Sequence, residues 1–244
     1  MGPTNLASLR WLALLGIGLL RVPPISAQQP SWCSTTSFQD GDSNQTGSHF
    51  RILPMGASIV YGLESSDGNG FRLGLQNLLE ANGTQVTMVG TQWSGNMSDN
   101  HHEAYLAVTI DDFTNKSDHS GAYGLEANVI LVLIGTNDCW YVQNQNSTAA
   151  DPRVGDGIAA ASRFGDSLLG SIWAHAPGAL VLSSTLPRNT NQWEDRCIQG
   201  FNSHLPAVVH DAVARGQQVR LVDMYDVVPV DQIQADGTHP TDEG

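Results

Sequence analysis

The stretch RILPMGASIV, residues 51–60, runs from apolar residues typical of a buried strand into a tight turn that ends on a serine. The small residues Gly56 and Ala57 end the strand pattern just before Ser58. Such a turn either only reverses the chain, with the serine hydroxyl hydrogen-bonded to the backbone, or positions the serine as a nucleophile. Which of the two applies depends on the partners that the rest of the chain offers to Ser58.

Further apolar runs, separated by segments of helical periodicity, predict strand–helix–strand units around a parallel sheet. The expected strands span 50–55, 85–90, 128–134, 179–184 and 218–223, and the expected helices span 70–82, 156–175 and 195–215. Strands that are apolar on both faces are typical of a sheet covered by helices on both sides. The sequence therefore predicts an α/β fold with a parallel five-stranded sheet between helical layers.

Three polar motifs lie at the carboxyl ends of these strands or after the last one, where ligands bind in sheets of this kind. They are GAS at 56–58, GTND at 135–138 and DGTH at 236–239. Their common position at one edge of the predicted sheet favours a single site.

A serine hydroxyl is a weak nucleophile unless a base takes its proton, and a histidine held by a carboxylate is the common solution. Ser58 is therefore the candidate nucleophile, His239 the base and Asp236 its partner. The side-chain amide of Asn137, just past a buried strand, is a candidate donor to the oxyanion of an acyl-transfer intermediate. The alternatives are a turn hydroxyl at Ser58, and a surface turn or a metal pair at 236–239.

Ser58, GTND at 135–138 and DGTHP at 236–240, in this order, resemble the SGNH (GDSL-type) hydrolase superfamily. The stretch VGTQWSGNMSDNHHEAYLAVTIDD, 89–112, is similar to the secreted carbohydrate esterases of family three, which include acetyl xylan esterases. The resemblance covers nearly all of residues 50–244. It implies a flavodoxin-like three-layer α/β/α domain, ester hydrolysis by a serine and no cofactor.

The resemblance implies a catalytic role for Ser58, Asp236 and His239, and an oxyanion hole made by the backbone N–H of Ser58, Asn137 and the N–H of Ala107. Two residues depart from the family pattern. Ala57 stands where the family usually has an aspartate, and Ala107 stands where it usually has a glycine, which adopts positive φ freely. Loss of one oxyanion donor typically costs on the order of 100-fold in rate, so reduced activity is expected if the N–H of Ala107 is misplaced.

Four side chains near the predicted site are candidates for contact with a substrate: Trp93, His102, Trp140 and Tyr141. The three aromatic residues could stack on a sugar ring, but ordinary packing explains them equally well. Adjacent histidines at 101 and 102 point apart on an extended chain, so no metal site is expected there.

The first 27 residues predict a cleaved export signal, because Arg10 precedes an apolar run over 11–20 that is shorter than the roughly 20 residues needed to span a bilayer. Residues 28–48 are polar and are expected to be a flexible lead-in. The remaining 49–244 are expected to form one hydrolase domain. The family usually continues with a helix after the DGTHP motif, so this domain is expected to lack its C-terminal helix.

The acidic composition argues against a nucleic-acid partner. The formal charge is −13, and removal of Arg10 and Arg21 with the signal makes the mature chain more negative. Five Asn-X-Ser/Thr sequons fit a secreted, extracellular glycoprotein, at Asn44, Asn82, Asn96, Asn115 and Asn146. We expect no membrane segment in the mature protein, and a monomer.

Three cysteines in an exported chain predict one disulfide. The pairing of Cys139 with Cys197 is favoured because both lie inside the predicted domain, while Cys33 lies in the lead-in.

The leading hypothesis is a secreted serine esterase that removes small acyl groups, acetyl above all, from plant-type polysaccharides or their oligomers. One alternative is a carbohydrate-binding protein on a weakened hydrolase scaffold, which Ala57 and Ala107 would explain. Another is an esterase for lipid acyl groups.

Overall fold

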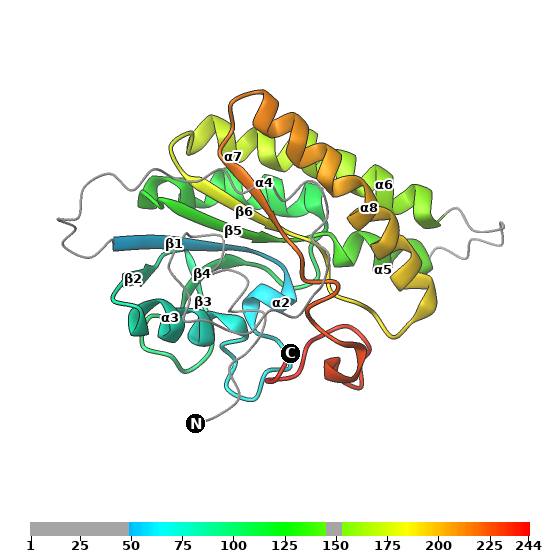
Figure 1. The fold of residues 1–244 in the computed structure, drawn as a ribbon, viewed down its shortest axis with the longest axis horizontal. Helices are drawn as coiled ribbons and strands as arrows, with labels where there is room; N and C mark the ends of the chain where they lie inside the picture. Colours follow the sequence, from blue (N-terminus) through cyan, green and yellow to red (C-terminus); the bar gives the residue numbers. More distant parts are fainter. Residues whose placement is uncertain (1–48, 145–152) are drawn as a thin grey trace.

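The computed structural model describes residues 49–144 and 153–244. The predicted export signal, the lead-in, Cys33, Asn44 and Asn146 lie outside these residues. The described chain is a twisted sheet with helices on both faces (Figure 1).

Five parallel strands form the main part of the sheet, in the order β2-β1-β5-β6-β7. They are β1 (His49–Gly56), β2 (Gln85–Met88), β5 (Val129–Leu133), β6 (Leu180–Ser184) and β7 (Val219–Val222). Each lies close to its predicted range, and the order is that of flavodoxin-like sheets. The predicted fold class is confirmed.

Two short strands, β3 (Gln92–Trp93) and β4 (His101–Ala104), were not predicted. They pair with each other antiparallel, and β4 runs parallel to the end of β1, with Ala104 opposite Gly56. Their sequences, QW and HHEA, are too short and too polar to show a strand pattern. β4 brings the chain that follows it to the same sheet edge as Ser58.

The helices are divided between the two faces of the sheet (Figure 1). One face is covered by α3 (Phe71–Ala81), and the other by α4 (Ile110–Ser120), α6 (Arg153–Arg163), α7 (Gly170–His175) and α8 (Gln192–Ala214). A π-helical stretch, η2 (Phe164–Leu169), joins α6 to α7, so the helix predicted over 156–175 is one continuous helical run. Short helical segments are α2 (Ser58–Tyr61), η1 (Ala122–Leu125), α5 (Thr136–Asn144) and η3 (Val230–Gln232).

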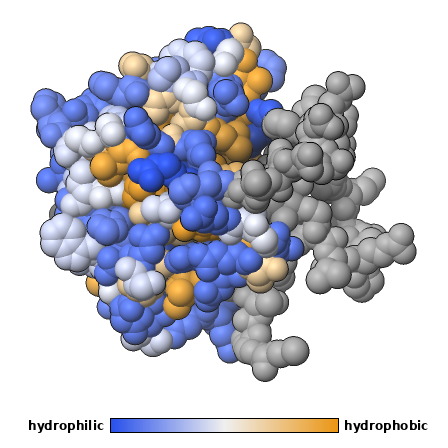
Figure 2. Space-filling model, turned by 90° about the vertical axis from the view of Figure 1, so that its left-hand side faces the viewer, coloured by the Kyte–Doolittle hydropathy of each residue, from blue (hydrophilic) through white to orange (hydrophobic). Residues whose placement is uncertain are grey.

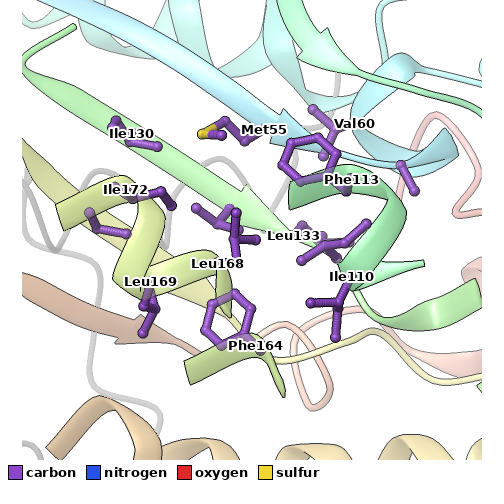
Figure 3. Packing of buried hydrophobic residues seen from close by; sticks show 14 of the residues in the cluster. Met55, Val60, Ile110, Phe113, Ile130, Leu133, Phe164, Leu168, Leu169 and Ile172 are labelled. Carbon is purple, nitrogen blue, oxygen red and sulfur yellow. The ribbon is translucent and has the colours of Figure 1, made fainter. Parts of the chain in front are cut away.

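The buried core lies on both sides of the sheet because successive side chains of the central strands point alternately into two apolar clusters. In β5, Ile130 and Val132 face the cluster under α4 and η2, while Val129 and Leu131 face the cluster under α3. Figure 3 shows part of the first cluster, to which the strands contribute Met55 and Leu133 and the helices contribute Phe113, Phe164 and Leu168. Burial on both faces explains the nearly continuous apolar character of these strands.

The surface carries the predicted glycan acceptors that fall within the described residues. Asn82, Asn96 and Asn115 are all exposed. Figure 2 shows one face on which hydrophilic residues predominate, with small hydrophobic patches between them. Within 49–144 and 153–244, no helix is both long enough and apolar enough to cross a bilayer.

Candidate active site

The turn after β1 brings Ser58 to the sheet edge. Gly56 lies against β5 so closely that a Cβ there would be 2.1 Å from the carbonyl oxygen of Leu133. Only glycine fits this contact, which is why the strand ends in a small residue. Ser58 follows as the first residue of α2 and is partly buried.

Ser58 is joined to two side chains from the end of the chain by a continuous hydrogen-bonded path. The Oγ of Ser58 lies 2.7 Å from Nε2 of His239, and Nδ1 of His239 lies 2.5 Å from Oδ2 of Asp236. Ser58 and His239 are 181 residues apart in sequence. The imidazole is thus held between a hydroxyl and a carboxylate, in the order that a serine nucleophile requires.

Asp236 is stabilised as a carboxylate. Partial burial acts to raise its pKa, but hydrogen bonds from the backbone N–H of Thr238 and from His239 outweigh burial, and the pKa lies below its ordinary value. The backbone N–H groups of Thr238 and His239 both donate to Oδ1, at 2.9 and 3.0 Å. Asp236 therefore orders the turn while its other oxygen holds the imidazole.

The three expected oxyanion donors come from three different strand ends. Within the described residues, the backbone N–H groups of Ser58 and Ala107 donate no hydrogen bond. The side-chain amide of Asn137 donates one N–H to the carbonyl oxygen of Val108, at 2.9 Å, and its second N–H donates to no other described residue. All three groups therefore have an N–H to offer to a developing negative charge.

Ala107, which the sequence resemblance aligns with a glycine of the family, has a backbone conformation typical of glycine. Its φ is +56°, in the left-handed region that favours glycine. The side chain of Ala107 is exposed, so its methyl group takes no space in the core. Alanine at position 107 therefore adopts the same backbone conformation as glycine would, at the cost of some backbone strain.

Helix α5 holds the chain around Ala107 by three hydrogen bonds. Besides the bond from Asn137 to Val108, the hydroxyl of Tyr141 donates to the carbonyl oxygen of Ala107 at 3.2 Å. The N–H of Ile110 donates to Oδ2 of Asp138 at 3.1 Å. We call residues 107–110 the oxyanion loop, and these contacts fix it to the helix that carries Asn137.

Asp138 and Cys139 tie α5 to the helices behind it. Burial raises the pKa of Asp138, and Arg163 on α6 opposes this with a hydrogen bond of 3.0 Å to Oδ1. Cys139 forms a disulfide with Cys197 of α8, as predicted.

A buried polar network braces α2, where the sequence has Ala57 in place of the usual aspartate. The guanidinium of Arg72 is completely buried and donates to the carbonyl oxygen of Tyr61 at 3.1 Å and to Oγ of Ser94 at 2.9 Å. The hydroxyl of Ser94 also donates to the carbonyl oxygen of Tyr61. The last residue of α2 is thus held by two donors, while the methyl of Ala57 packs in the apolar core.

The prediction that His102 contacts a substrate is wrong. Its side chain is completely buried, Nδ1 accepts from the N–H of Ala104 at 3.1 Å, and Nε2 lies 2.8 Å from Oγ of Ser94. Burial, with the charges of Arg72 and His101, lowers the pKa of His102 to about 3. His102 is therefore a neutral part of the buried network, and neither ring nitrogen is available to a metal or a sugar.

The other three predicted substrate contacts are exposed side chains. Trp140 and Tyr141 lie on α5, separated from the GTND motif by Cys139, and their ring centroids are 5.1 Å apart. Trp93 lies on β3, an outer strand of the sheet, and is the most exposed of the three at 68%. Tyr141 contacts residues 107–110 through its hydroxyl group.

The sequence did not point to Arg72, Asn189 and Glu194, whose hydrogen bonds hold α2 and the turn at 236–239 in place. Asn189 bonds to the turn that carries His239, and Glu194 bonds to Asn189. The only sequence signal was an acid in the first turn of a helix, a position that is common in helices with no functional role.

A family model and several solved structures are similar to this chain. The model of the GDSL-like Lipase/Acylhydrolase family matches residues 55–244. A search of curated proteins gave no match. The fold is similar to three solved structures, a family 3 carbohydrate esterase from Clostridium thermocellum, a family 3 carbohydrate esterase from Talaromyces cellulolyticus and an acetylxylan esterase from Geobacillus stearothermophilus.

The similarity to these structures lies in the fold, because the identities are low. The first has a TM-score of 0.62 at 21% identity and covers 79% of this chain and 88% of its own. The second has a TM-score of 0.61 at 18% identity and covers 78% of this chain and 88% of its own. The third has a TM-score of 0.54 at 13% identity and covers 80% of this chain and 88% of its own. The family match extends over most of the sequence: the chain belongs to the GDSL-like lipase/acylhydrolase family and is a carboxylic ester hydrolase.

Proposed function

We propose that the protein is a serine esterase in which Ser58 is the nucleophile, His239 the general base and Asp236 the residue that orients His239. The observation that carries the proposal is the hydrogen-bonded path from Ser58 through His239 to Asp236. The N–H groups of Ser58 and Ala107 and the amide of Asn137 form the oxyanion hole.

In this mechanism Ser58 Oγ attacks the ester carbonyl carbon while Nε2 of His239 takes the hydroxyl proton. The carbonyl oxygen becomes an oxyanion and accepts hydrogen bonds from the oxyanion hole. His239 then gives its proton to the departing alcohol, which leaves an acyl group on Ser58. Water then attacks the acyl carbon while His239 takes its proton, and His239 gives this proton to Ser58 Oγ as the bond between Oγ and the acyl carbon breaks and the acid leaves.

The substrate that we propose is an acetylated carbohydrate outside the cell. The names of the similar structures, which include acetylxylan and family 3 carbohydrate esterases, support it, as do the exposed rings of Trp140 and Tyr141 beside the oxyanion loop. The predicted export signal and the three exposed sequon asparagines support secretion and glycosylation.

The test is hydrolysis of 4-nitrophenyl acetate and of acetylated xylo-oligosaccharides by the wild type and by Ser58→Ala. The wild type should release acetate from both, and Ser58→Ala should fall to a rate close to the uncatalysed one. Equal rates for the two proteins would contradict the proposal. Saturable binding of the oligosaccharide without turnover would support a carbohydrate-binding protein instead.

A second candidate, an esterase for longer acyl chains, rests on a cavity of about 460 Å³ on the α3 side of the site. Its wall includes Ile59, which follows Ser58, and Pro240, which follows His239, together with Leu63, Phe71 and Met224. A series of 4-nitrophenyl esters from two to twelve carbons separates the two candidates. An optimum beyond about eight carbons would favour the longer-chain candidate, since each buried methylene contributes roughly 0.8 kcal/mol.

A further inference from the structure

Glu194 is a buried carboxylate that has no direct role in the Ser58–His239–Asp236 triad. It lies in the first turn of α8 and is 5% exposed. Burial raises its pKa, and the negative charge of Asp236 raises it further, although a hydrogen bond from Asn189 acts in the opposite direction. Folding therefore works against the charged form of Glu194, so this side chain costs stability that an apolar residue would not.

Asn189 connects this carboxylate to the turn that carries His239. Its Nδ2 donates to Oε2 of Glu194 at 2.6 Å and to Oγ1 of Thr238 at 3.1 Å. Its Oδ1 accepts from the N–H of Asn191 at 2.8 Å. Because a carboxylate oxygen only accepts, the contact with Glu194 fixes which end of the amide faces Thr238.

The turn 236–239 depends on such contacts because it lies outside any regular helix or strand. It is held from the α8 side by two bonds, from Asn189 to Thr238 and from the N–H of Thr190 to the carbonyl oxygen of Gly237 at 2.9 Å. The packing there is close, since a Cβ on Gly237 would lie 2.4 Å from Oγ1 of Thr190.

We propose that Glu194 and Asn189 are positioning residues for His239. Glu194 orients the amide of Asn189, and Asn189 holds Thr238, which directly precedes His239, so that Nε2 stays within hydrogen-bonding distance of Ser58. This inference rests on the proposed function, since it assigns residues that keep the base of that reaction in place.

The experiment measures kcat and KM with 4-nitrophenyl acetate for Glu194→Ala, Asn189→Ala and the double variant. Each single change should lower kcat on the order of tenfold and leave KM within about twofold, because the base is misplaced while the substrate contacts remain. The double variant should be no slower than Asn189→Ala alone, because both residues act along one path.

Two further variants separate positioning from a general effect on folding. Glu194→Gln keeps an oxygen that accepts from Asn189 and should restore kcat to within about threefold of the wild type. Thr238→Val removes the last hydrogen bond of the path without touching α8 and should lower kcat as Asn189→Ala does. Gln192→Ala, at an exposed position of the same helical turn, is the matched control and should leave kcat unchanged.

Three results would overturn the inference: wild-type kcat in Glu194→Ala and Asn189→Ala, effects that multiply in the double variant, or a kcat in Glu194→Gln as low as in Glu194→Ala. Failure of the proposed function looks different, because the wild type itself would then turn over no faster than Ser58→Ala.

Discussion

Ala107 is one of three non-glycine residues with positive φ in the described chain, together with Glu64 and Glu126. A left-handed conformation costs a non-glycine residue roughly 1–2 kcal/mol, and the freer unfolded chain of glycine offsets part of the gain from replacing it. Ala107→Gly should therefore raise the free energy of unfolding by up to about 1 kcal/mol, measured by urea denaturation.

The activity of Ala107→Gly tests whether the alanine already places its N–H correctly. We expect kcat to stay within about threefold of the wild type, because the backbone conformation is typical of glycine. The matched control is Glu126→Gly, which removes the same kind of strain, at φ +55°, in the chain before β5. A rise in kcat of about 100-fold in Ala107→Gly alone would show that the N–H of Ala107 is misplaced.

His102 predicts a specific dependence of stability on pH. Its pKa of about 3 lies below the ordinary value of 6.5, so between these limits the unfolded state binds one more proton than the folded state. The free energy of unfolding should therefore fall with decreasing pH, with a contribution from His102 of up to about 1.4 kcal/mol per pH unit. Above pH 6.5 His102 is neutral in both states, so the stability that is lost at lower pH is then fully present.

The comparison protein for this prediction is His102→Gln, in which an amide can still donate to Ser94. Urea denaturation between pH 7.5 and 4 should show a shallower pH dependence for His102→Gln, and the two curves should differ by the titration of one group. Parallel curves would mean that His102 titrates normally in the folded protein.

Among the helices, α5 both carries Asn137 and holds the oxyanion loop, residues 107–110, by hydrogen bonds. Tyr141→Phe removes the hydrogen bond to Ala107 and keeps the ring. We expect kcat to fall roughly threefold to tenfold with KM nearly unchanged, since one hydrogen bond contributes about 0.5–1.5 kcal/mol.

Tyr141→Leu separates this effect from stacking on a sugar. If the ring binds substrate, Tyr141→Leu should raise KM for acetylated xylo-oligosaccharides well above the value for Tyr141→Phe, while KM for 4-nitrophenyl acetate changes little. Wild-type kcat in Tyr141→Phe would rule out a role of the hydroxyl in placing the loop.

The disulfide joins α5 to α8 across 58 residues of sequence. Closing a loop of this length restricts the unfolded chain, and the chain-entropy relation gives about 4 kcal/mol. Replacing Cys139 and Cys197 together by serine should lower the free energy of unfolding by a few kcal/mol, about 2–4 in typical cases. If the wild type measured with and without reductant shows the same stability, the disulfide is absent or without effect.

The apolar runs were sufficient to predict the central sheet and the fold class at the scale of the whole molecule. They failed for α4 and the β3–β4 pair. The sequence of α4, IDDFTNKSDHS, is mostly polar, and β4 depends on its pairing with β1. Helix α5 was also missed, because GTND was interpreted only as the end of a strand.

The contacts of His239 with Ser58 and Asp236 could be inferred because Ser58 follows a strand and the other two residues lie beyond the last strand. The supporting contacts could not, since they join residues far apart in the chain, such as Arg72 with Ser94 and Asn189 with Thr238. The error at His102 has the same origin: sequence does not show whether a polar side chain in a short strand is buried.

We propose that the fold makes Ser58 an activated nucleophile. The most direct measurement is the reaction of the native protein with a fluorophosphonate, followed by peptide mapping by mass spectrometry. We predict a single adduct on Ser58, formed slowly or not at all in His239→Ala and absent from protein unfolded in urea. An adduct on another residue, or labelling of Ser58 at the same rate in His239→Ala, would contradict the claim.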